Sequence, residues 1–452
     1  MRKEVNMLEG SITKGLLAMM IPIMIMNVMQ NMFSVIDMTV LGNLVDDNAV
    51  GAVGACGVLI TLCTALLIGV SVGANVIVAK HIGEGDRKKT ENAIGTSLLF
   101  SLLGGMVIAI IGFVFAETFL LWTNCDLELL PQATSYFRIY FIGVPIIMFY
   151  NFSASVLRAA GETKLPMYFL FIGGTFKIAF NFFAITVLGL DVEGVATATV
   201  LSNLIAGSLC YLRLTKMKER FTVSFRLFKL HLSELKPMIY IGVPAGLQSA
   251  LYSLANVVIA STVNTFGKEA TTGLAIANQF DGIMYQIIYA PSLALVPYMA
   301  QNIGAGNIKR AKKALMTATL LNIAIGATLG ALSAIFSKQL SGIMSNDPLV
   351  IMYSMQKMVI VSSTYFICGI NEILGGALRG MGKPMLPVVA TLVFMCGIRF
   401  VWVYGVFPYF PDNITFLYLI WPIGWILSIS TLIGPCLWNI KKLERKREGY
   451  II

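Results

Sequence analysis

Charged residues are scarce in this chain. Lys, Arg, Asp and Glu make up 12% of its 452 residues, while 57% are hydrophobic, and the mean hydropathy is +0.79. A soluble particle of this size needs more polar surface than such a composition supplies. The composition therefore excludes a soluble globular protein and makes the lipid bilayer the first expected partner.

Residues that bind transition metals or build disulfide frameworks are also few. The sequence has two histidines, His81 and His231, and no Cys-x-x-Cys motif. We therefore expect no dedicated metal site and no cofactor. Of the seven cysteines, Cys125 alone falls in an expected loop, which argues against a disulfide framework.

Motifs of catalysis and nucleotide binding are missing or misplaced. Gly69-Val70-Ser71-Val72-Gly73 fits the nucleophile pattern GxSxG, but that pattern needs a strand–turn–helix elbow and this copy lies in an apolar run. The same residues fit GxxxG, a close-packing face between membrane helices, which we favour. No Gly-Lys-Ser/Thr follows the other glycine-rich loops. The sequence thus predicts neither an enzyme nor an ATP-driven pump, so transport would draw on an ion gradient.

What the sequence does contain is about twelve apolar runs of the ~20 residues that a helix needs to cross a bilayer. The alternating ten-residue segments of a membrane barrel are absent. We therefore predict an all-α polytopic membrane protein with about twelve transmembrane helices. The expected spans are 14–41, 50–79, 92–117, 133–157, 167–190, 194–214, 238–264, 270–300, 314–338, 350–378, 385–408 and 415–440.

Two loop motifs occur twice at one spacing. Gly83 and Gly304 of the Ile-Gly-x-Gly loops are 304 − 83 = 221 positions apart, and so are Arg158 and Arg379 of the Leu-Arg-x-x-Gly motifs, 379 − 158 = 221. A shared offset indicates a duplicated unit. We predict an N-lobe over 1–220 and a C-lobe over 221–452, which includes a basic tail. Six spans return each lobe to its starting side, so a pseudo-two-fold axis along the membrane normal relates the lobes as a parallel repeat.

These loops have a structural interpretation. Arg158 and Arg379 each end a helix, where a cation meets the negative end of the helix dipole and can bond free carbonyls. Gly161 and Gly382 then permit the tight turn that follows. We interpret the loops as helix caps of two equivalent lobes rather than as substrate sites.

Basic residues lie mostly at one end of the expected spans. Most of the 33 Lys and Arg lie before the first span or after the even-numbered spans, which the positive-inside rule places in the cytoplasm. We predict a multi-pass protein of the cell membrane with both termini cytoplasmic and an uncleaved first span. This topology explains the net charge of +10 without a nucleic-acid partner. The basic residues elsewhere are Lys268, Lys338, Lys357, Arg138, Lys177 and Arg399.

Several motifs together resemble one transporter family. They are the twelve spans, the two duplicated loops, Val35-Ile36-Asp37-Met38-Thr39-Val40-Leu41-Gly42 in the first span, and Gly242-Val243-Pro244-Ala245-Gly246 in the seventh. This set resembles the multidrug and toxic compound extrusion family over nearly the whole chain. The resemblance implies two six-helix bundles around a central cavity, alternating access, and export of mostly cationic, amphipathic compounds in exchange for Na+ or H+. We expect a monomer that acts on small molecules and confers drug resistance.

The clearest candidate for ion coupling is Asp37, an acid deep in the first span. A charge at such a depth costs about 2.5 to 3.5 kcal/mol on insertion scales. Its repeat counterpart is Ile259, so the scaffold does not require an acid there. The resemblance carries Asp37 over as the coupling carboxylate, which can bind Na+ or exchange a proton. A structural ion pair or a helix cap is the alternative.

The family's Na+ site also implies three further residues. It adds an Asn and an Asp four residues apart on the fifth span and a Thr eighteen residues beyond that Asp. This chain has Lys177, Asn181 and Thr199 at those positions. Lys177 and Asn181 share a helix face, and we expect Lys177 to pair with Asp37 where relatives would hold Na+. The sequence therefore favours H+ over Na+, with Na+ at Asp37 as the alternative.

The C-lobe offers further candidates for the substrate cavity. Asp281 and Glu372 are its deep acids, and Arg399 is their expected counter-charge; it lies at nearly the repeat position of Lys177, 399 − 177 = 222. Glu372 lies near the cytoplasmic end of its span, where a solvated or capping role is the alternative. Methionine repacks around different ligands, and aromatic rings bind amphipathic ones. The apolar and aromatic candidates are Met29, Phe33, Tyr252 and Tyr285.

Three function classes agree with these residues to different degrees. An ion-coupled efflux antiporter agrees best with the acids and with the resemblance. A flippase of lipid-linked oligosaccharides or of another anionic substrate is the second, because Lys177 and Arg399 are cations within the membrane that can hold a pyrophosphate. A channel or membrane enzyme has no motif in its support.

Overall fold

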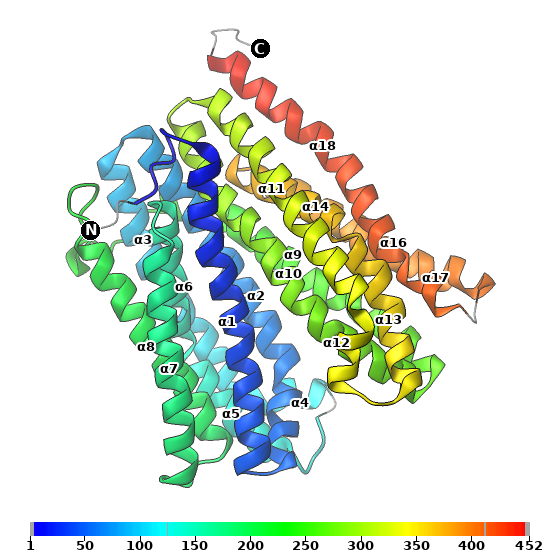
Figure 1. The fold of residues 1–452 in the computed structure, drawn as a ribbon. Coiled ribbons are helices and arrows are strands. Elements are labelled where there is room, and N and C mark those ends of the chain that lie inside the picture. The colour runs from blue at the N-terminus through cyan, green and yellow to red at the C-terminus, as the bar shows by residue number, and fades with distance from the viewer. Residues whose placement is uncertain (1–3, 124, 411–412, 448–452) are drawn as a thin grey trace. The chain divides into compact units, whose positions relative to one another are not determined.

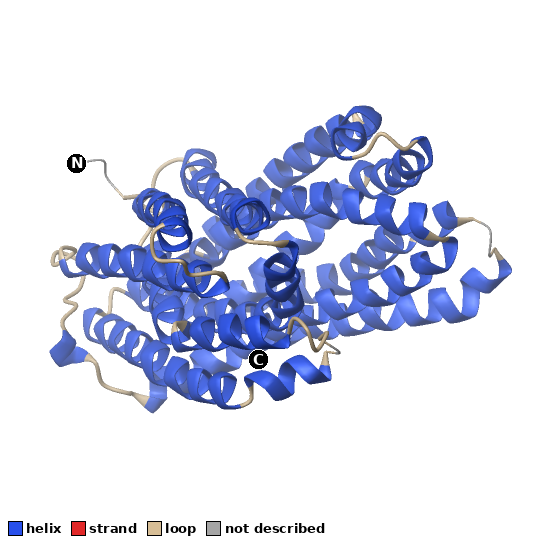
Figure 2. Cartoon of the chain, turned by 90° about the horizontal axis from the view of Figure 1, so that it is seen from below, coloured by secondary structure: helices blue, strands red, loops and turns tan. Residues whose placement is uncertain are grey.

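Every regular element of the described residues is a helix (Figure 2). The computed structural model describes residues 4–123, 125–410 and 413–447. Arg2 and Lys3, which belong to the basic segment before the first span, lie outside the described residues, as do both chain ends that were predicted to be cytoplasmic.

The elements follow one another along the chain as labelled in Figure 1. The first half contains α1 (Ile12–Leu44), α2 (Asp47–Glu84), α3 (Arg87–Val114), α4 (Ala116–Trp122), α5 (Leu130–Ile142), α6 (Val144–Ala159), α7 (Lys164–Thr186), α8 (Val192–Thr215) and η1 (Phe225–Leu227). The second half contains α9 (Leu232–Val263), η2 (Asn264–Phe266), α10 (Lys268–Gly304), α11 (Ile308–Ile335), α12 (Ser337–Met344), α13 (Pro348–Ser363), α14 (Tyr365–Gly380), α15 (Met385–Ala390), η3 (Thr391–Gly397), α16 (Ile398–Val401), η4 (Trp402–Val406), η5 (Phe407–Tyr409), α17 (Ile414–Tyr418) and α18 (Ile420–Arg447).

The predicted number of membrane spans is confirmed for the described residues. Ten helices are long and apolar enough to cross a membrane, and two bent pairs bring the number to as many as 12. The pair α5 and α6 bends by 46° and the pair α13 and α14 by 50°. The bends lie at Gly143 and Thr364, which obey the repeat, 364 − 143 = 221. Pro145 in the first turn of α6 removes an amide donor there, and the Thr364 hydroxyl donates to the Ile360 carbonyl at 3.0 Å, which bends helices.

The eleventh span is less regular than the single helix predicted for 385–408. Two π-helical segments, η3 and η4, flank the short helix α16, which carries Arg399. Each π turn inserts residues into the helical repeat, so it rotates the side chains that follow, and such turns are frequent at functional sites. Sequence periodicity gave no sign of them.

Contacts group the described residues into two compact units. Unit 1 contains 4–5 and 25–246, and unit 2 contains 6–24 and 247–447. The change of unit therefore falls inside α1 and inside α9, at positions that obey the repeat, 246 − 24 = 222. The predicted lobes divide the chain by its duplication at 220, whereas these units divide it by packing, so each unit takes the first part of one long helix from the other half.

Glycines explain why the first part of α9 belongs to unit 1. A Cβ atom on Gly69 would lie 2.1 Å from the Gly246 nitrogen, and one on Gly73 would lie 2.0 Å from the Met238 carbonyl oxygen. The backbones of α2 and α9 touch along this line, as the GxxxG interpretation expects. Ser71 lies within α2 and not at a strand–turn–helix elbow, so the nucleophile interpretation is excluded.

The same close contacts recur at the repeat offset. A Cβ on Gly105 of α3 would lie 2.6 Å from Pro145 Cα, and a Cβ on Gly326 of α11 would lie 2.8 Å from Phe366 Cα. Both members of the contact move by one offset, 326 − 105 = 221 and 366 − 145 = 221. The duplication is therefore visible in the helix packing itself and not only in the loops.

The duplicated loops contain the predicted turns. Gly161 and Gly382 have φ of 86° and 72°, a region in which a side chain is strained, and each follows the helix that ends near its arginine. Gly83 and Gly304 lie in the last turns of α2 and α10, before the left-handed Gly85 and Gly306.

Arg379 differs from the predicted carbonyl cap. It is buried at 2% exposure and donates to Gln248 Oε1 on α9 at 2.9 Å and to Ser292 Oγ on α10 at 3.2 Å. Arg158 lies in the last turn of α6. The second arginine therefore ties three helices together instead of only closing its own.

The glycine contacts predict a stability difference between matched variants. Gly105→Ala and Gly326→Ala should each lower the free energy of unfolding by about 1–3 kcal/mol through overpacking. The reason is that backbone atoms of the neighbouring helix lie where the methyl group would be. As controls, Gly54→Ala and Gly434→Ala lie in α2 and α18, where the added Cβ would have no atom of another described segment within 4 Å. They should be neutral or gain up to ~1 kcal/mol from helix propensity. Thermal unfolding in detergent tests this, and equal melting temperatures for both sets would contradict the packing.

Candidate functional site

The structure brings three of the predicted coupling residues together in unit 1. Lys177 Nζ lies 2.5 Å from Asp37 Oδ2, and Asn181 Nδ2 donates to Asp37 Oδ1 at 2.8 Å. All three side chains are buried, with exposures of 8% for Asp37, 7% for Lys177 and 0% for Asn181. Lys177 and Asn181 are one turn apart on α7, so a single helix face supplies both partners of the carboxylate.

The neighbouring residues let α1 approach α7 closely. Phe33 lies one turn before Asp37 on α1, and a Cβ on Gly174 of α7 would lie 1.9 Å from the Phe33 ring. Gly174 therefore leaves space for the ring three residues before Lys177. Met29, two turns before Asp37, is half-buried on the same helix.

Thr199 forms no hydrogen bond with this group among the described residues. Its hydroxyl donates to the Val195 carbonyl of its own helix, α8, at 3.0 Å. The predicted set of four is thus a set of three around Asp37. The Asn181 Oδ1 atom is buried without a hydrogen-bond partner among the described residues.

The negative charge of Asp37 is balanced by the Lys177 ammonium, without an added ion. One carboxylate oxygen faces an ammonium group and the other accepts from a neutral amide. A Na+ ion at the carboxylate would lie beside the Lys177 ammonium, and two like charges repel strongly where little water screens them. No cluster of three or more His, Cys, Asp or Glu that can hold a metal occurs among the described residues.

A second buried pair lies in unit 2 and was only partly foreseen. Lys357 Nζ of α13 lies 2.5 Å from Asp281 Oδ2 of α10 and also donates to Asn278 Oδ1, one turn earlier on α10. Lys357 is 1% exposed. Sequence reasoning noted this lysine as a basic residue away from the cytoplasmic loops but gave it no partner. The rule that a charge in lipid needs compensation is the signal that could have assigned Lys357 an acidic partner.

Arg399 is not the described counter-charge of either acid, which corrects the prediction. Its NH1 donates to Asn256 Oδ1 on α9 at 2.8 Å. Its Cζ also lies 5.1 Å from the centre of the Trp421 ring, and Lys357 Nζ lies 5.4 Å from that same centre. Two buried cations thus share one indole, whose ring face attracts positive charge.

Glu372 is buried and held by tyrosines. It is 2% exposed, and its Oε1 accepts from Tyr285 at 3.3 Å and from Tyr252 at 3.5 Å. Asn371 Nδ2 donates to the Tyr252 hydroxyl at 3.2 Å. The solvated alternative for Glu372 is therefore wrong. The two tyrosines proposed as cavity lining also serve as its hydrogen-bond donors.

Comparisons with known proteins agree with this architecture. A model of the MatE family matches residues 22–183 and 244–404. The probable multidrug resistance protein YoeA of Bacillus subtilis is 25% identical over 448 residues, 97% of this chain and 96% of that protein. The FAD transporter of Shewanella oneidensis is 24% identical over 336 residues, 73% of this chain and 74% of that protein.

A solved structure shows the same fold. It is a MOP superfamily transporter from Pyrococcus furiosus, described as having a binding pocket of reverse polarity that suggests a different function. It covers 98% of both chains with a TM-score of 0.89 at 20% sequence identity. The spans define a multi-pass membrane protein, and the solved structure shows its fold. The chain belongs to the MatE family, a family of multidrug efflux transporters.

The ion pair of Asp281 with Lys357 predicts how the stability of the protein changes when one of the two charges is removed. Lys357→Met should lower the stability by about 3–5 kcal/mol, because it leaves Asp281 as an uncompensated buried charge. Combining it with Asp281→Asn should recover much of that loss, since neither charge remains. Lys338→Met, at an exposed position of α12, is the matched control. Thermal unfolding of the four proteins is the measurement, and a single variant as stable as wild type would contradict the pair.

Proposed function

We propose that the protein is a proton-coupled antiporter that exports amphipathic, mostly cationic small molecules across the cell membrane. The observation that carries this proposal is the buried contact of Asp37 with Lys177 and Asn181. The basic loops support cytoplasmic termini. In this proposal the protein is a transporter and not an enzyme. Its central cavity opens alternately to the two sides of the membrane.

Proton exchange at Asp37 changes how strongly α1 is attached to α7. With Asp37 ionised, the carboxylate and the Lys177 ammonium attract each other where little water screens them. Once Asp37 is protonated, the attraction is lost and Lys177 remains as a buried cation without its counter-charge, which is costly. The two protonation states therefore favour different arrangements of the helices, which is the differential interaction that a coupled conformational change requires.

The substitution at Lys177 explains why H+ is favoured over Na+. An Asn and an Asp at 177 and 181 would add an oxygen ligand and a second negative charge beside Asp37. This chain instead has a positive side chain and a neutral amide, so the site's net charge changes by two units in the direction that repels cations. The ammonium acts as a tethered counter-ion that cannot diffuse away.

The names of relatives and two side chains near Asp37 support the export of amphipathic compounds. YoeA is called a probable multidrug resistance protein. On α1, Met29 and Phe33 lie on the same side as Asp37, separated by one-turn steps. A flexible thioether and an aromatic ring beside a titratable acid suit an apolar cation.

One alternative has a specific observation in its favour. In unit 2 the buried cations Lys357 and Arg399 lie around Trp421, and Asp281 forms an ion pair with Lys357 but not with Arg399. This excess of positive charge suits an anionic substrate, such as a phosphorylated one or a lipid-linked oligosaccharide. A relative is named FAD transporter, and FAD carries a pyrophosphate.

Transport in inverted membrane vesicles tests the proposal. Wild-type vesicles should accumulate ethidium when a pH gradient is imposed and should not respond to a Na+ gradient at fixed pH. Asp37→Asn should abolish the response to pH because the titratable group is gone, whereas Lys268→Gln, at the start of α10, should not. Uptake driven by Na+ alone would refute proton coupling. Uptake of FAD but not of ethidium would favour the anionic alternative.

A double substitution tests the role given to Lys177. Lys177→Asn combined with Asn181→Asp restores the residue types that relatives use for Na+, so the double variant should gain stimulation by a Na+ gradient. Lys177→Asn alone should lose proton-driven transport, because the ammonium partner of Asp37 is gone. It should not gain stimulation by Na+, because only one oxygen ligand is added. The same vesicles provide the measurement. A double variant that ignores Na+ while remaining folded would show that Lys177 does not replace the ion.

A further inference from the structure

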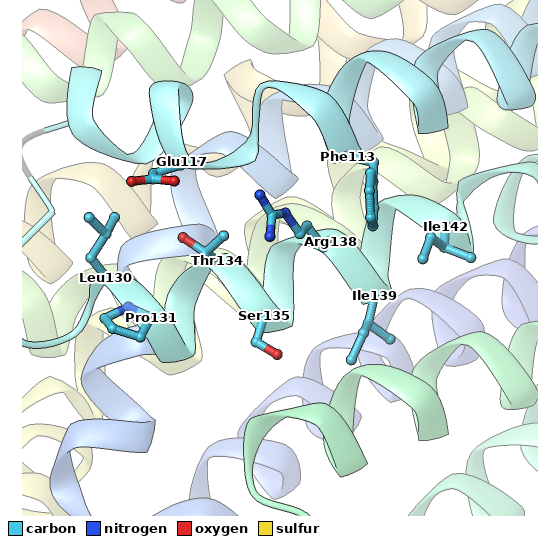
Figure 3. A pocket seen from close by; sticks show the side chains of 9 residues that line it. All are labelled: Phe113, Glu117, Leu130, Pro131, Thr134, Ser135, Arg138, Ile139 and Ile142. Carbon is cyan, nitrogen blue, oxygen red and sulfur yellow. The ribbon is translucent and has the colours of Figure 1, made fainter.

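A pocket at the end of unit 1 is lined by polar groups that the coupling mechanism does not use. It has a volume of about 520 Å³ and lies between the end of α3, α4 and α5 (Figure 3). Its lining includes Phe113 of α3, Glu117 of α4, and Thr134 and Arg138 of α5. The pocket lies at the end of α3 that is remote from the basic loop where this helix begins.

Two polar groups of this pocket have no partner among the described residues. Thr134 is 8% exposed and its Oγ1 is buried without a hydrogen bond, and the Nε of Arg138 is buried without an acceptor. They lie one turn apart on the same face of α5, which faces α4 in Figure 3. Ser135 is different, because its hydroxyl donates to Glu193 Oε1 at 2.7 Å. A buried donor without an acceptor costs about 1–3 kcal/mol, so adjacent ones indicate a missing ligand with acceptor oxygens.

The charges of the pocket specify that ligand further. The Arg138 guanidinium lies 5.4 Å from the centre of the Phe113 ring, which positions its planar fork for a phosphate. Glu117 brings a carboxylate to the same pocket (Figure 3). A phosphate alone would be repelled by that carboxylate. A headgroup with a phosphate and a primary ammonium satisfies both side chains.

The surface beside the pocket suits acyl chains. Apolar side chains of α3 are exposed in the two turns that lead to the pocket, namely Met106, Val107, Ile110, Ile111 and Val114. A lipid whose headgroup occupies the pocket can lay its chains along this surface, which a free phosphate compound cannot use.

The repeat shows that the scaffold does not require these polar residues. One offset of 221 further along, Glu117, Thr134 and Arg138 correspond to Lys338, Met355 and Val359. The second copy therefore lacks both the hydroxyl and the guanidinium, and its charge at the position that corresponds to Glu117 is reversed. The polar set is a particular feature of the first copy.

We propose that this pocket binds the headgroup of a phosphatidylethanolamine, with Arg138 and Thr134 donating to the phosphate and Glu117 accepting from the ammonium. Asp37 and its partners Lys177 and Asn181 do not line this pocket. It gives the transporter a lipid bound at the surface of unit 1.

Native mass spectrometry of the purified full-length protein with defined phospholipids tests this. Wild type should retain phosphatidylethanolamine more strongly than phosphatidylcholine, which has no ammonium N–H, or phosphatidylglycerol, which has no cation. Arg138→Gln should weaken phosphatidylethanolamine retention on the order of tenfold, as expected for loss of a charge-assisted hydrogen bond. Glu117→Gln should reduce the preference over phosphatidylglycerol. Lys338→Gln, at the repeat position of Glu117, should match wild type.

Other outcomes would overturn the proposal. Equal retention of the three lipids by wild type, which does not depend on any variant's folding, would remove the headgroup assignment. Unchanged retention in both Arg138→Gln and Thr134→Val would place the lipid elsewhere. Displacement of the lipid by excess inorganic phosphate would show that the site takes free phosphate instead.

Discussion

A charge among hydrocarbon chains is stable only when another group compensates it. This constraint explains why each unit contains a buried acid paired with a lysine. An isolated charge at the centre of a span costs about 2.5–3.5 kcal/mol on insertion scales. Asp37 is compensated by Lys177 and Asn181, and Asp281 by Lys357. Each contact joins two helices that are distant in the sequence. The need for compensation therefore also fixes how those helices lie against each other.

The two units share their helix packing but not the positions of their buried charges. Equivalent glycines at Gly105 and Gly326 allow equivalent helix crossings, and bends at Gly143 and Thr364 recur at the same offset. The ion pairs follow no such rule, because α1 pairs with α7 in unit 1 and α10 pairs with α13 in unit 2. The helix packing therefore follows the duplication, whereas the buried charges do not.

The fold was largely predictable because its determinants are local or repeated. Apolar length determines a span, and two copies of a loop motif reveal the duplication, so twelve spans could be counted from residues alone. The contact of Lys177 with Asp37 was also foreseen, but on two grounds of different kinds. The one-turn spacing put Lys177 and Asn181 on one helix face, whereas the resemblance to the family placed that face opposite Asp37.

The rest depends on how helices rotate about their axes, which spacing does not give. Arg399 was expected beside an acid, but it follows a π-helical segment and donates to Asn256. Lys357 of α13 instead pairs with Asp281 of α10, the position expected for Arg399. Thr199 remains bound to its own helix for the same reason.

The most direct test of the account is to ask which ion leaves Asp37 when substrate binds. Purified protein in a weakly buffered, Na+-free solution should release protons on addition of ethidium. Asp37→Asn should release none, and added Na+ should not change the wild-type release. If substrate instead displaces bound radioactive Na+ without releasing protons, Lys177 does not replace the ion and the account is wrong.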